Sequence, residues 1–223
     1  MNRIDQMTGK GKKFFVAYYT AGFPTVADSG AILDTLVESG CDLIELGYPF
    51  SDPTADGPTI QASSQTALEN GFTRAGYFQL LQEFRQRHPD VPAIVFSYYN
   101  PIFHYGIDKF AEKAKAAGAD GMLIVDLPHE EQADVRAVLD REGLHLIQLV
   151  APTTGQERTG EILKNASGFI YQISLRGVTG VRDTIAADAG ENIARTRAVS
   201  ELPIALGFGV GTGEQARAVA AAA

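Results

Sequence analysis

The chain of 223 residues has one cysteine, Cys41, so an internal disulfide is impossible and a reducing compartment fits its composition. It has no apolar run long enough to span a membrane, and its first residues lack the apolar core of a signal peptide. Basic residues are in the minority, 19 against 27 acidic ones, which gives a net charge of −8. We therefore expect a cytoplasmic protein whose main partner is neither nucleic acid nor a membrane.

Three features of common catalytic sites are also missing. No lysine lies at the end of a predicted strand, which disfavours Schiff-base chemistry. The 4 histidines are scattered without ligand spacing, so no catalytic metal is expected. No Gly-x-Gly-x-x-Gly follows the first predicted strand, which counts against a doubly wound dinucleotide-binding sheet.

What the chain does contain is a regular alternation of short apolar segments and helical segments. Strands are predicted over residues 14–19, 41–46, 93–98, 121–125, 144–150, 169–174 and 203–206. Helices are predicted over residues 28–39, 59–70, 73–87, 107–117, 130–142, 156–165, within 190–200 and over 214–223. Such alternation implies a parallel sheet, and the spacings favour a (β/α)8 TIM barrel over a doubly wound sheet. We expect one domain over residues 1–223, with the eighth strand and helix absent from the chain.

Two carboxylates stand out near the end of the second predicted strand. Glu45 is the one charged residue near the tip of that apolar strand, and residues 47–58 form a loop with three prolines and two glycines. Burial would raise the pKa of Glu45, which suits a general acid or base, although a structural glutamate bonded to a neighbouring strand is the alternative. Asp56 lies on the loop that can fold over Glu45, and N-capping of the next helix is its alternative role.

Aromatic and glycine residues supply the other candidate groups. Aromatic side chains that form either a pocket wall or ordinary core are found on three predicted strands: Tyr18, Phe96, Tyr98 and Tyr171. Glycine-containing segments follow the sixth and seventh strands, at residues 177–180 and 207–209. Their backbone N–H groups can converge on an anion, so we expect a phosphate site there.

Residues 45–58 read ELGYPFSDPTADGP and strongly resemble the signature of the tryptophan synthase α subunit family. Shorter matches follow in the same order as in that family. They are YYTAGFP at 18–24, YYNP at 98–101, VDLP at 125–128, GVTG at 177–180 and GFG at 207–209. The similarity runs in register from about residue 14 to the end of the chain, so it covers nearly all of the sequence.

The resemblance implies a (β/α)8 barrel that cleaves indole-3-glycerol phosphate to indole and glyceraldehyde 3-phosphate, without a metal or an organic cofactor. Glu45 matches the family's acid/base glutamate, and Asp56 matches the aspartate that binds the indole N–H. The other matched positions are expected to bind substrate, the aromatic ones around indole and the glycine loops around phosphate. They are Tyr18, Phe96, Tyr98, Tyr171, Gly180, Gly207, Phe208 and Gly209.

The resemblance also implies a partner, the tryptophan synthase β subunit, in an αββα heterotetramer. Two other functions stay open: a non-catalytic or regulatory subunit of the β chain, and a different phosphosugar enzyme on the same barrel. Tyr48 and Arg176 depart from the family pattern, standing where an aliphatic and a small residue are usual. Since the chain stops at Ala223, before the family's last phosphate-binding turn, we expect it to be poorly active as written.

Overall fold

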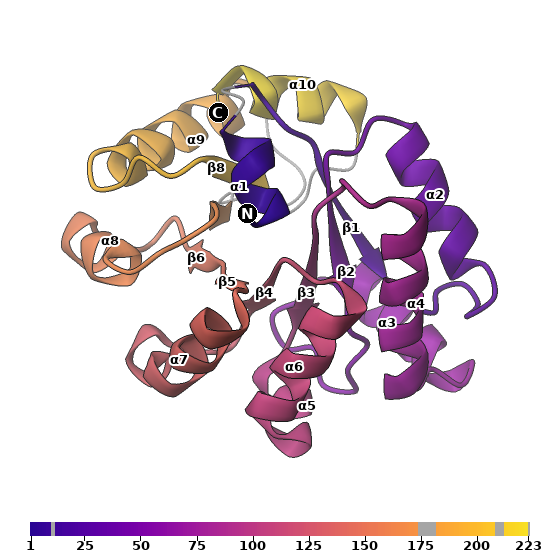
Figure 1. The fold of residues 1–223 in the computed structure, drawn as a ribbon. Coiled ribbons are helices and arrows are strands. Elements are labelled where there is room, and N and C mark those ends of the chain that lie inside the picture. The colour runs from indigo at the N-terminus through magenta and orange to yellow at the C-terminus, as the bar shows by residue number, and fades with distance from the viewer. Residues whose placement is uncertain (10–11, 174–181, 208–211, 223) are drawn as a thin grey trace. The chain divides into compact units, whose positions relative to one another are not determined.

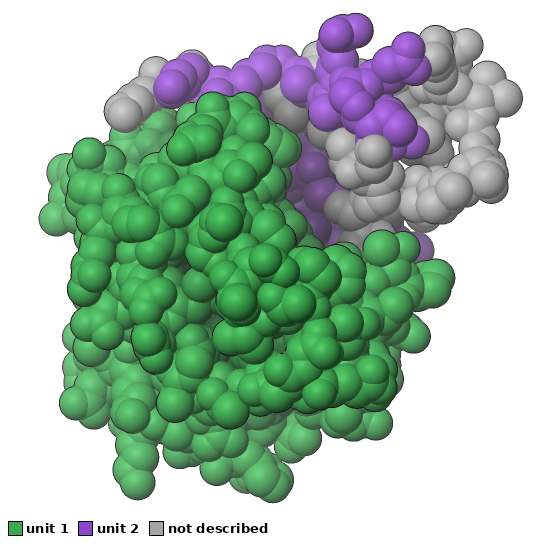
Figure 2. All heavy atoms as spheres, turned by 90° about the vertical axis from the view of Figure 1, so that its right-hand side faces the viewer, with its two compact units in different colours: residues 1–10, 14–146 green, residues 11–13, 147–223 purple. Residues whose placement is uncertain are grey.

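The computed structural model of the chain describes residues 1–9, 12–173, 182–207 and 212–222. It divides into two compact units, shown in different colours in Figure 2. The first comprises residues 1–10 and 14–146, and the second comprises residues 11–13 and 147–223. Each unit contains its own parallel sheet. The single domain expected over residues 1–223 stays a prediction.

The first unit has a sheet of five parallel strands in the order β1-β2-β3-β4-β5. The strands are β1 (Val16–Thr20), β2 (Leu43–Gly47), β3 (Ala93–Ser97), β4 (Gly121–Ile124) and β5 (His145–Leu146). In the register of the sheet, Glu45 of β2 lies between Tyr18 of β1 and Ile94 of β3. Strand order therefore follows chain order, as the predicted βα units require.

Helices connect these strands, and several of them follow one another along one side of the sheet (Figure 1). They are α1 (Arg3–Thr8), α2 (Ser29–Glu38), α3 (Pro58–Glu69), α4 (Arg74–Arg87), α5 (Tyr99–Tyr105), α6 (Ile107–Ala117), the short 3-10 helix η1 (His129–Glu131) and α7 (Ala133–Glu142). Helix α6 illustrates how the sequence determines a helix. It buries Phe110, Ala111 and Ala114 on one face and ends at Gly118. Gly118 has a φ of 101°, a conformation that glycine adopts readily.

The two faces of the first sheet have different surroundings. On β2, Ile44 and Leu46 pack into an apolar cluster with helix residues such as Leu33 and Leu81. Because side chains alternate along a strand, Leu43 and Glu45 point to the opposite face. The aliphatic residues of β2 thus face the helices, and the carboxylate faces away from them.

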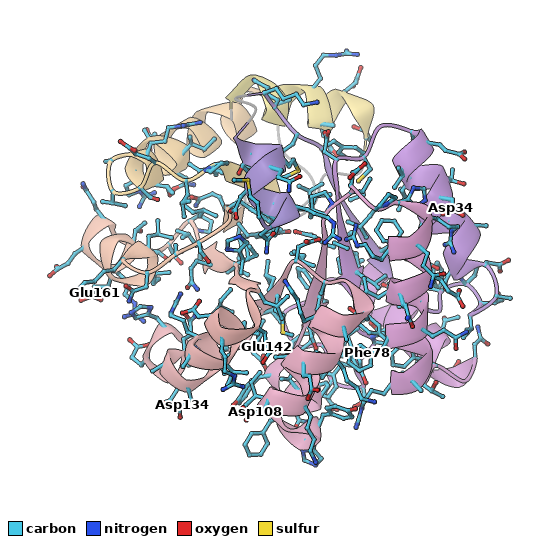
Figure 3. The ribbon with its side chains drawn as sticks, viewed as in Figure 1. Asp34, Phe78, Asp108, Asp134, Glu142 and Glu161 are labelled. Atoms are coloured by element: carbon cyan, nitrogen blue, oxygen red, sulfur yellow. The ribbon has the colours of Figure 1, made fainter. Side chains whose placement is uncertain are left out.

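Most acidic side chains of the helices are on the outside of the unit instead. Figure 3 shows Asp34, Asp108 and Asp134 on α2, α6 and α7, on the side away from the strands. Asp108 pairs there with Arg141 at 2.7 Å, and both side chains are more than half exposed. Solvated carboxylates of this kind need no further partner, which sets Glu45 apart from them.

Helix α1 was not predicted, and polar contacts anchor it to the ends of β4 and α7. The Asn2 side chain donates to the carbonyl oxygens of Asp120 and Gly143, at 2.7 and 3.2 Å. The buried carboxylate of Asp120 pairs with Arg3 at 2.9 Å and with Arg85 at 3.0 Å. Sequence patterns did not indicate this helix because its 6 residues are too few to show a periodicity.

The second unit has a three-stranded parallel sheet in the order β6-β7-β8. Its elements are β6 (Gln148–Val150), α8 (Gln156–Leu163), β7 (Ile170–Ile173), α9 (Arg182–Arg197), β8 (Ile204–Gly207) and α10 (Gly213–Ala222). Its apolar core is formed by side chains from all three strands and from α8 and α9: Val150, Leu163, Ile170, Ile193 and Ile204.

Three predictions of element boundaries were wrong. The fifth predicted strand is interrupted at Ile147, so β5 belongs to the first sheet and β6 to the second. Helix α5 begins at Tyr99, where only a loop was expected after β3; Pro101 falls in its first turn, where proline is tolerated. Helix α9 begins at Arg182 instead of after residue 190, so a polar segment without a clear apolar stripe is helical.

In the described parts of the chain no helix combines the length and the apolar character needed to cross a membrane.

Candidate active site

Glu45 is the most unusual side chain of the first sheet, because it is a carboxyl group that is only 3% exposed. Its Oε1 atom has no hydrogen-bond partner among the described residues. Burial is the cause that raises its pKa, from 4.5 to about 8. No hydrogen bond to a neighbouring strand offsets this shift, so the structure gives no support to a purely structural role. A carboxyl group with this pKa can donate and accept a proton near neutral pH.

Asp56 lies on the loop between β2 and α3, and its carboxylate accepts a hydrogen bond from the Tyr98 hydroxyl at 3.0 Å. The N-cap of α3 is Gly57, with no side-chain capping bond, so the alternative that Asp56 caps this helix is wrong. Burial raises the pKa of Asp56, and the hydrogen bond from Tyr98 acts in the opposite direction. Asp52 comes earlier on the same loop, and its side chain makes only a local contact, with the Ser51 hydroxyl at 2.5 Å.

The aromatic side chains of β1 and β3 that were predicted as a pocket wall are in contact with one another, and their role in a pocket stays a prediction. The rings of Tyr18 and Phe96 pack edge to face, with centroids 5.1 Å apart and an interplanar angle of 79°. Tyr98 packs against Phe50 at 5.3 Å, a contact that the sequence did not indicate. Tyr48 lies instead among the aromatic rings near the helices, 5.1 Å from Phe72 and 5.0 Å from Tyr77. Its departure from the family pattern is therefore part of the helix-side core.

Tyr18 connects the aromatic wall with the two carboxylates. Its ring leans toward the end of β2, and a Cβ at Gly47 would lie well inside 3.0 Å of its hydroxyl oxygen. Glycine at position 47 thus makes room for the hydroxyl, a role that sequence reasoning missed. Burial raises the pKa of Tyr18, and the charges of Asp56 and Glu45 raise it further. The phenol therefore lies within the electrostatic reach of both carboxylates and stays protonated.

The second unit repeats this arrangement of tyrosine and glycine. Tyr171 of β7 is 8% exposed and pairs in register with Ala205 of β8. A Cβ at Gly207, two residues further on, would lie well inside 3.0 Å of the Tyr171 hydroxyl oxygen. Tyr18 has the same relation to its register partner Glu45 and to Gly47. Of the remaining predicted site residues, Gly180, Phe208 and Gly209 lie outside the described residues, as does Arg176.

In the described parts of the chain, no group of three or more His, Cys, Asp or Glu side chains could hold a metal ion. Tyr18 lies within electrostatic reach of the carboxyl groups of Glu45 and Asp56, and Tyr98 is hydrogen-bonded to Asp56. One acid is buried and protonated near neutral pH, and the other is partly exposed and hydrogen-bonded. Two acids in such different environments can take two different roles in one reaction.

Solved structures agree with the fold expected from the sequence. The tryptophan synthase subunit alpha from Legionella pneumophila has a TM-score of 0.91 and 39% identity, with 100% of this chain and 84% of that chain covered. A tryptophan synthase a2b2 complex from Pyrococcus furiosus has a TM-score of 0.86 and 38% identity, with 93% and 83% covered. The fold therefore belongs to the (β/α)8 class of enzymes.

Sequence comparison is more specific. A family model described as "Tryptophan synthase alpha chain" matches residues 4–223. The tryptophan synthase alpha chain of Methanosarcina mazei is 45% identical over 217 residues, which is 97% of this chain and 78% of the relative. That of Desulfatibacillum aliphaticivorans is 45% identical over 220 residues, 99% of this chain and 83% of the relative. The chain belongs to the tryptophan synthase alpha chain family.

Proposed function

We propose that Glu45 and Asp56 catalyse the cleavage of indole-3-glycerol phosphate to indole and glyceraldehyde 3-phosphate. The chain is a lyase of its family's type, and this is the α reaction of tryptophan biosynthesis. The observation that supports the role of Glu45 is its burial, which raises its pKa to about 8 on the face of β2 away from the helices. A neutral carboxyl group there supplies the proton that the reaction needs first.

The bond to be broken joins C3 of the indole ring to the glycerol chain. Protonation of C3 by Glu45 makes an iminium ion, and the positive charge lies on the ring nitrogen. The Asp56 carboxylate accepts the indole N–H and stabilises that charge. The glycerol hydroxyl next to C3 then returns a proton to Glu45, its oxygen becomes the aldehyde oxygen, and the electrons of the broken C–C bond restore the indole ring. Glu45 ends in the state in which it began.

The aromatic side chains supply the indole pocket in this proposal. Tyr18, Phe96 and Tyr98 are on β1 and at the end of β3, and Tyr98 also holds Asp56 in place. Tyr171 is proposed as a further pocket residue. The phosphate is assigned from the family motifs to Gly180, Gly207, Phe208 and Gly209.

The proposed partner is a tryptophan synthase β subunit, in an αββα assembly in the cytoplasm. The Pyrococcus furiosus complex is described as an a2b2 assembly with mutual activation. By analogy, we expect indole release by this chain to rise when a β chain is added. The chain also has 45% identity to alpha chains over almost its entire length, which supports the same assembly.

The test is indole release by mass-verified protein, with and without a β chain. Glu45→Gln keeps the shape of the side chain and removes its acidity, so indole release should fall by roughly a thousandfold or more. Asp56→Asn should lower kcat/KM by roughly a hundredfold. Asp52→Asn is the matched control on the same loop, since its side chain contacts only Ser51, and it should retain activity.

Other outcomes would favour the other two functions. A wild-type chain that releases no indole but still activates the β chain would be a regulatory subunit. Turnover of a phosphosugar that has no indole, unaffected by changes at Tyr18 or Phe96, would point to a different barrel enzyme.

A further inference from the structure

The ring of Tyr18 packs on Phe96, a contact that a phenylalanine could make equally well, so the hydroxyl group of Tyr18 needs a separate explanation. The ring packs edge to face on Phe96, and its hydroxyl oxygen lies over the backbone of Gly47. A side chain at position 47 would point to the same face of β2 as Glu45, because the two residues are two positions apart. The Tyr18 hydroxyl therefore occupies the space next to Glu45, one layer nearer the carboxyl end of the strand.

The hydrogen bonding of Tyr18 leaves its own proton available. Thr20 donates to the Tyr18 oxygen at 3.4 Å, and the Thr20 hydroxyl is itself within 2.8 Å of the Ser63 hydroxyl. Ser63 donates its own proton to the Ile60 carbonyl oxygen at 2.8 Å and therefore competes for the single Thr20 proton. Within the described ranges the Tyr18 hydroxyl thus has only the long contact with Thr20. A half-buried phenol held by one weak contact is suited to bind an acceptor on the substrate.

We propose that the Tyr18 hydroxyl donates a hydrogen bond to the glycerol hydroxyl oxygen that Glu45 deprotonates. This inference rests on the proposed function and adds a role that a phenylalanine ring could not perform. The glycerol hydroxyl must give its proton to Glu45, which leaves its oxygen with lone pairs and a growing negative charge. A neutral donor next to Glu45, held in place by Phe96 and Thr20, is positioned to stabilise that oxygen.

The proposal also fits the electrostatics of the pair of carboxylates. Burial raises the pKa of Tyr18, and the nearby charges of Asp56 and Glu45 raise it further, so the phenol remains a donor throughout the working pH range. A carboxylate cannot take over this role, because an ionised carboxylate only accepts hydrogen bonds. As the C–C bond breaks, the same oxygen becomes the aldehyde oxygen and can keep the hydrogen bond.

The test uses two ligands that differ only in the glycerol hydroxyls. One is indole-3-glycerol phosphate, and the other is the phosphate ester of indole-3-propanol, which has the ring and the phosphate but neither glycerol hydroxyl. Their dissociation constants are measured by calorimetry for the Glu45→Gln chain, with and without Tyr18→Phe, so that turnover does not interfere. Tyr18→Phe should weaken the substrate about 5- to 10-fold and leave the propanol ester within about twofold.

Turnover gives the second readout. In the chain with wild-type Glu45, Tyr18→Phe should lower kcat/KM for indole release by roughly 10- to 100-fold, since the hydrogen bond strengthens as charge develops on the oxygen. Tyr48→Phe is the control, because it removes a hydroxyl from the aromatic cluster near the helices, where Tyr48 contacts Phe72 and Tyr77. Its kcat/KM should stay within about twofold of the wild type.

The outcomes separate this inference from the proposed function. Equal weakening of both ligands would overturn the inference, since the hydroxyl would then act on the pocket or on Asp56 and not on the glycerol chain. Unchanged binding of both ligands would overturn it too. A wild-type chain that releases no indole would defeat the proposed function, whereas a selective loss of substrate binding in Tyr18→Phe would still support the hydrogen bond.

Discussion

The hydroxyl of Tyr98, at the end of β3, donates a hydrogen bond to the carboxylate of Asp56 on the loop after β2, across 3.0 Å. The same hydroxyl oxygen accepts a hydrogen bond from the backbone N–H of Ala55 at 2.9 Å. One phenol therefore fixes two consecutive residues of the loop. Tyr98 is only 3% exposed and packs on Phe50, so the anchor itself is rigid. The hydrogen bond from Tyr98 therefore orients the Asp56 carboxylate, although Asp56 lies on a loop.

Tyr98→Phe should leave the fold intact and loosen the loop. The hydrogen bond from Tyr98 lowers the pKa of Asp56 against the effect of burial, so its loss should raise that pKa. Because the proposed role of Asp56 requires a carboxylate, the acidic limb of the kcat/KM profile should move to higher pH. At neutral pH kcat/KM should fall about fivefold, the value of roughly one hydrogen bond.

The measurement is the pH profile of indole release together with limited proteolysis of the loop. Tyr105→Phe is a suitable control, since that ring packs against Phe78, Phe110 and Arg74 on the helix side. An acidic limb that stays in place in Tyr98→Phe would show that the hydrogen bond does not tune Asp56.

Glu45 should make the chain less stable as the pH rises. Its carboxyl pKa is raised to about 8 in the folded chain from 4.5, so between these values the folded state binds a proton that the unfolded state has lost. The unfolded state then binds fewer protons, and the free energy of unfolding falls by about 1.4 kcal/mol per pH unit. Glu45→Gln removes this dependence. From pH 5.5 to 7.5 the variant should gain about 2.5 kcal/mol relative to the wild type.

Urea unfolding at several pH values tests this prediction. Asp52→Asn is the control, as an exposed turn residue whose replacement should change stability by less than about 0.5 kcal/mol at either pH. If Glu45→Gln and wild type differ by a constant amount across this range, the carboxyl group is not titrating as its burial implies. A more stable but inactive Glu45→Gln would show that the chain sacrifices stability at its active site.

The pH dependence of catalysis should report the same group. Glu45 must be protonated to deliver its proton to indole C3, so kcat/KM should fall tenfold per pH unit above about pH 8. It should also fall at low pH as Asp56 takes up a proton. Asp56→Asn should abolish the low-pH decline and leave the decline above pH 8. A profile that keeps rising above pH 8 would contradict the role of Glu45 as the first proton donor.

Much of the first sheet was predictable because it depends on local periodicity. Strand β2 was predicted from its apolar run, and its Ile44 and Leu46 pack in the cluster around Leu33 and Leu81. The predicted strands are all present, although the fifth is divided at Ile147. Strands can be predicted in this way because an element that buries one face must repeat apolar residues with the period of that element.

Contacts between distant segments were not predictable. The hydrogen bond of Tyr98 with Asp56 joins residues 42 positions apart, and the fit of Tyr18 over Gly47 depends on the register of β1 with β2. Helices α1 and α5 and the first half of α9 were missed for a related reason, because these segments are short or weakly amphipathic and tertiary contacts determine whether they are helical. The family resemblance supplied the roles of Glu45 and Asp56, and the structure supplied their environments.

The close approach of Tyr171 and Gly207 gives a prediction for the second unit. Gly207→Ala would place a Cβ against the hydroxyl and ring atoms of Tyr171, whose ring is buried and has little room to move. We expect a loss of about 1–3 kcal/mol in the free energy of unfolding, the usual cost of overpacking. Tyr171→Leu removes the tip of the ring, so Gly207→Ala on that background should cost much less.

A double-mutant cycle with urea unfolding measures this coupling, which should exceed about 1 kcal/mol. Gly160→Ala is the control in the same unit, because no atom lies within 4 Å of its added Cβ and its place in α8 favours alanine. That variant should be more stable by about 0.5–1 kcal/mol. Equal costs of Gly207→Ala with Tyr171 and with Leu at position 171 would show that the glycine serves another purpose. Because Gly207 is also assigned to the phosphate, indole release by the double variant would show whether relief of the clash is enough to restore substrate binding.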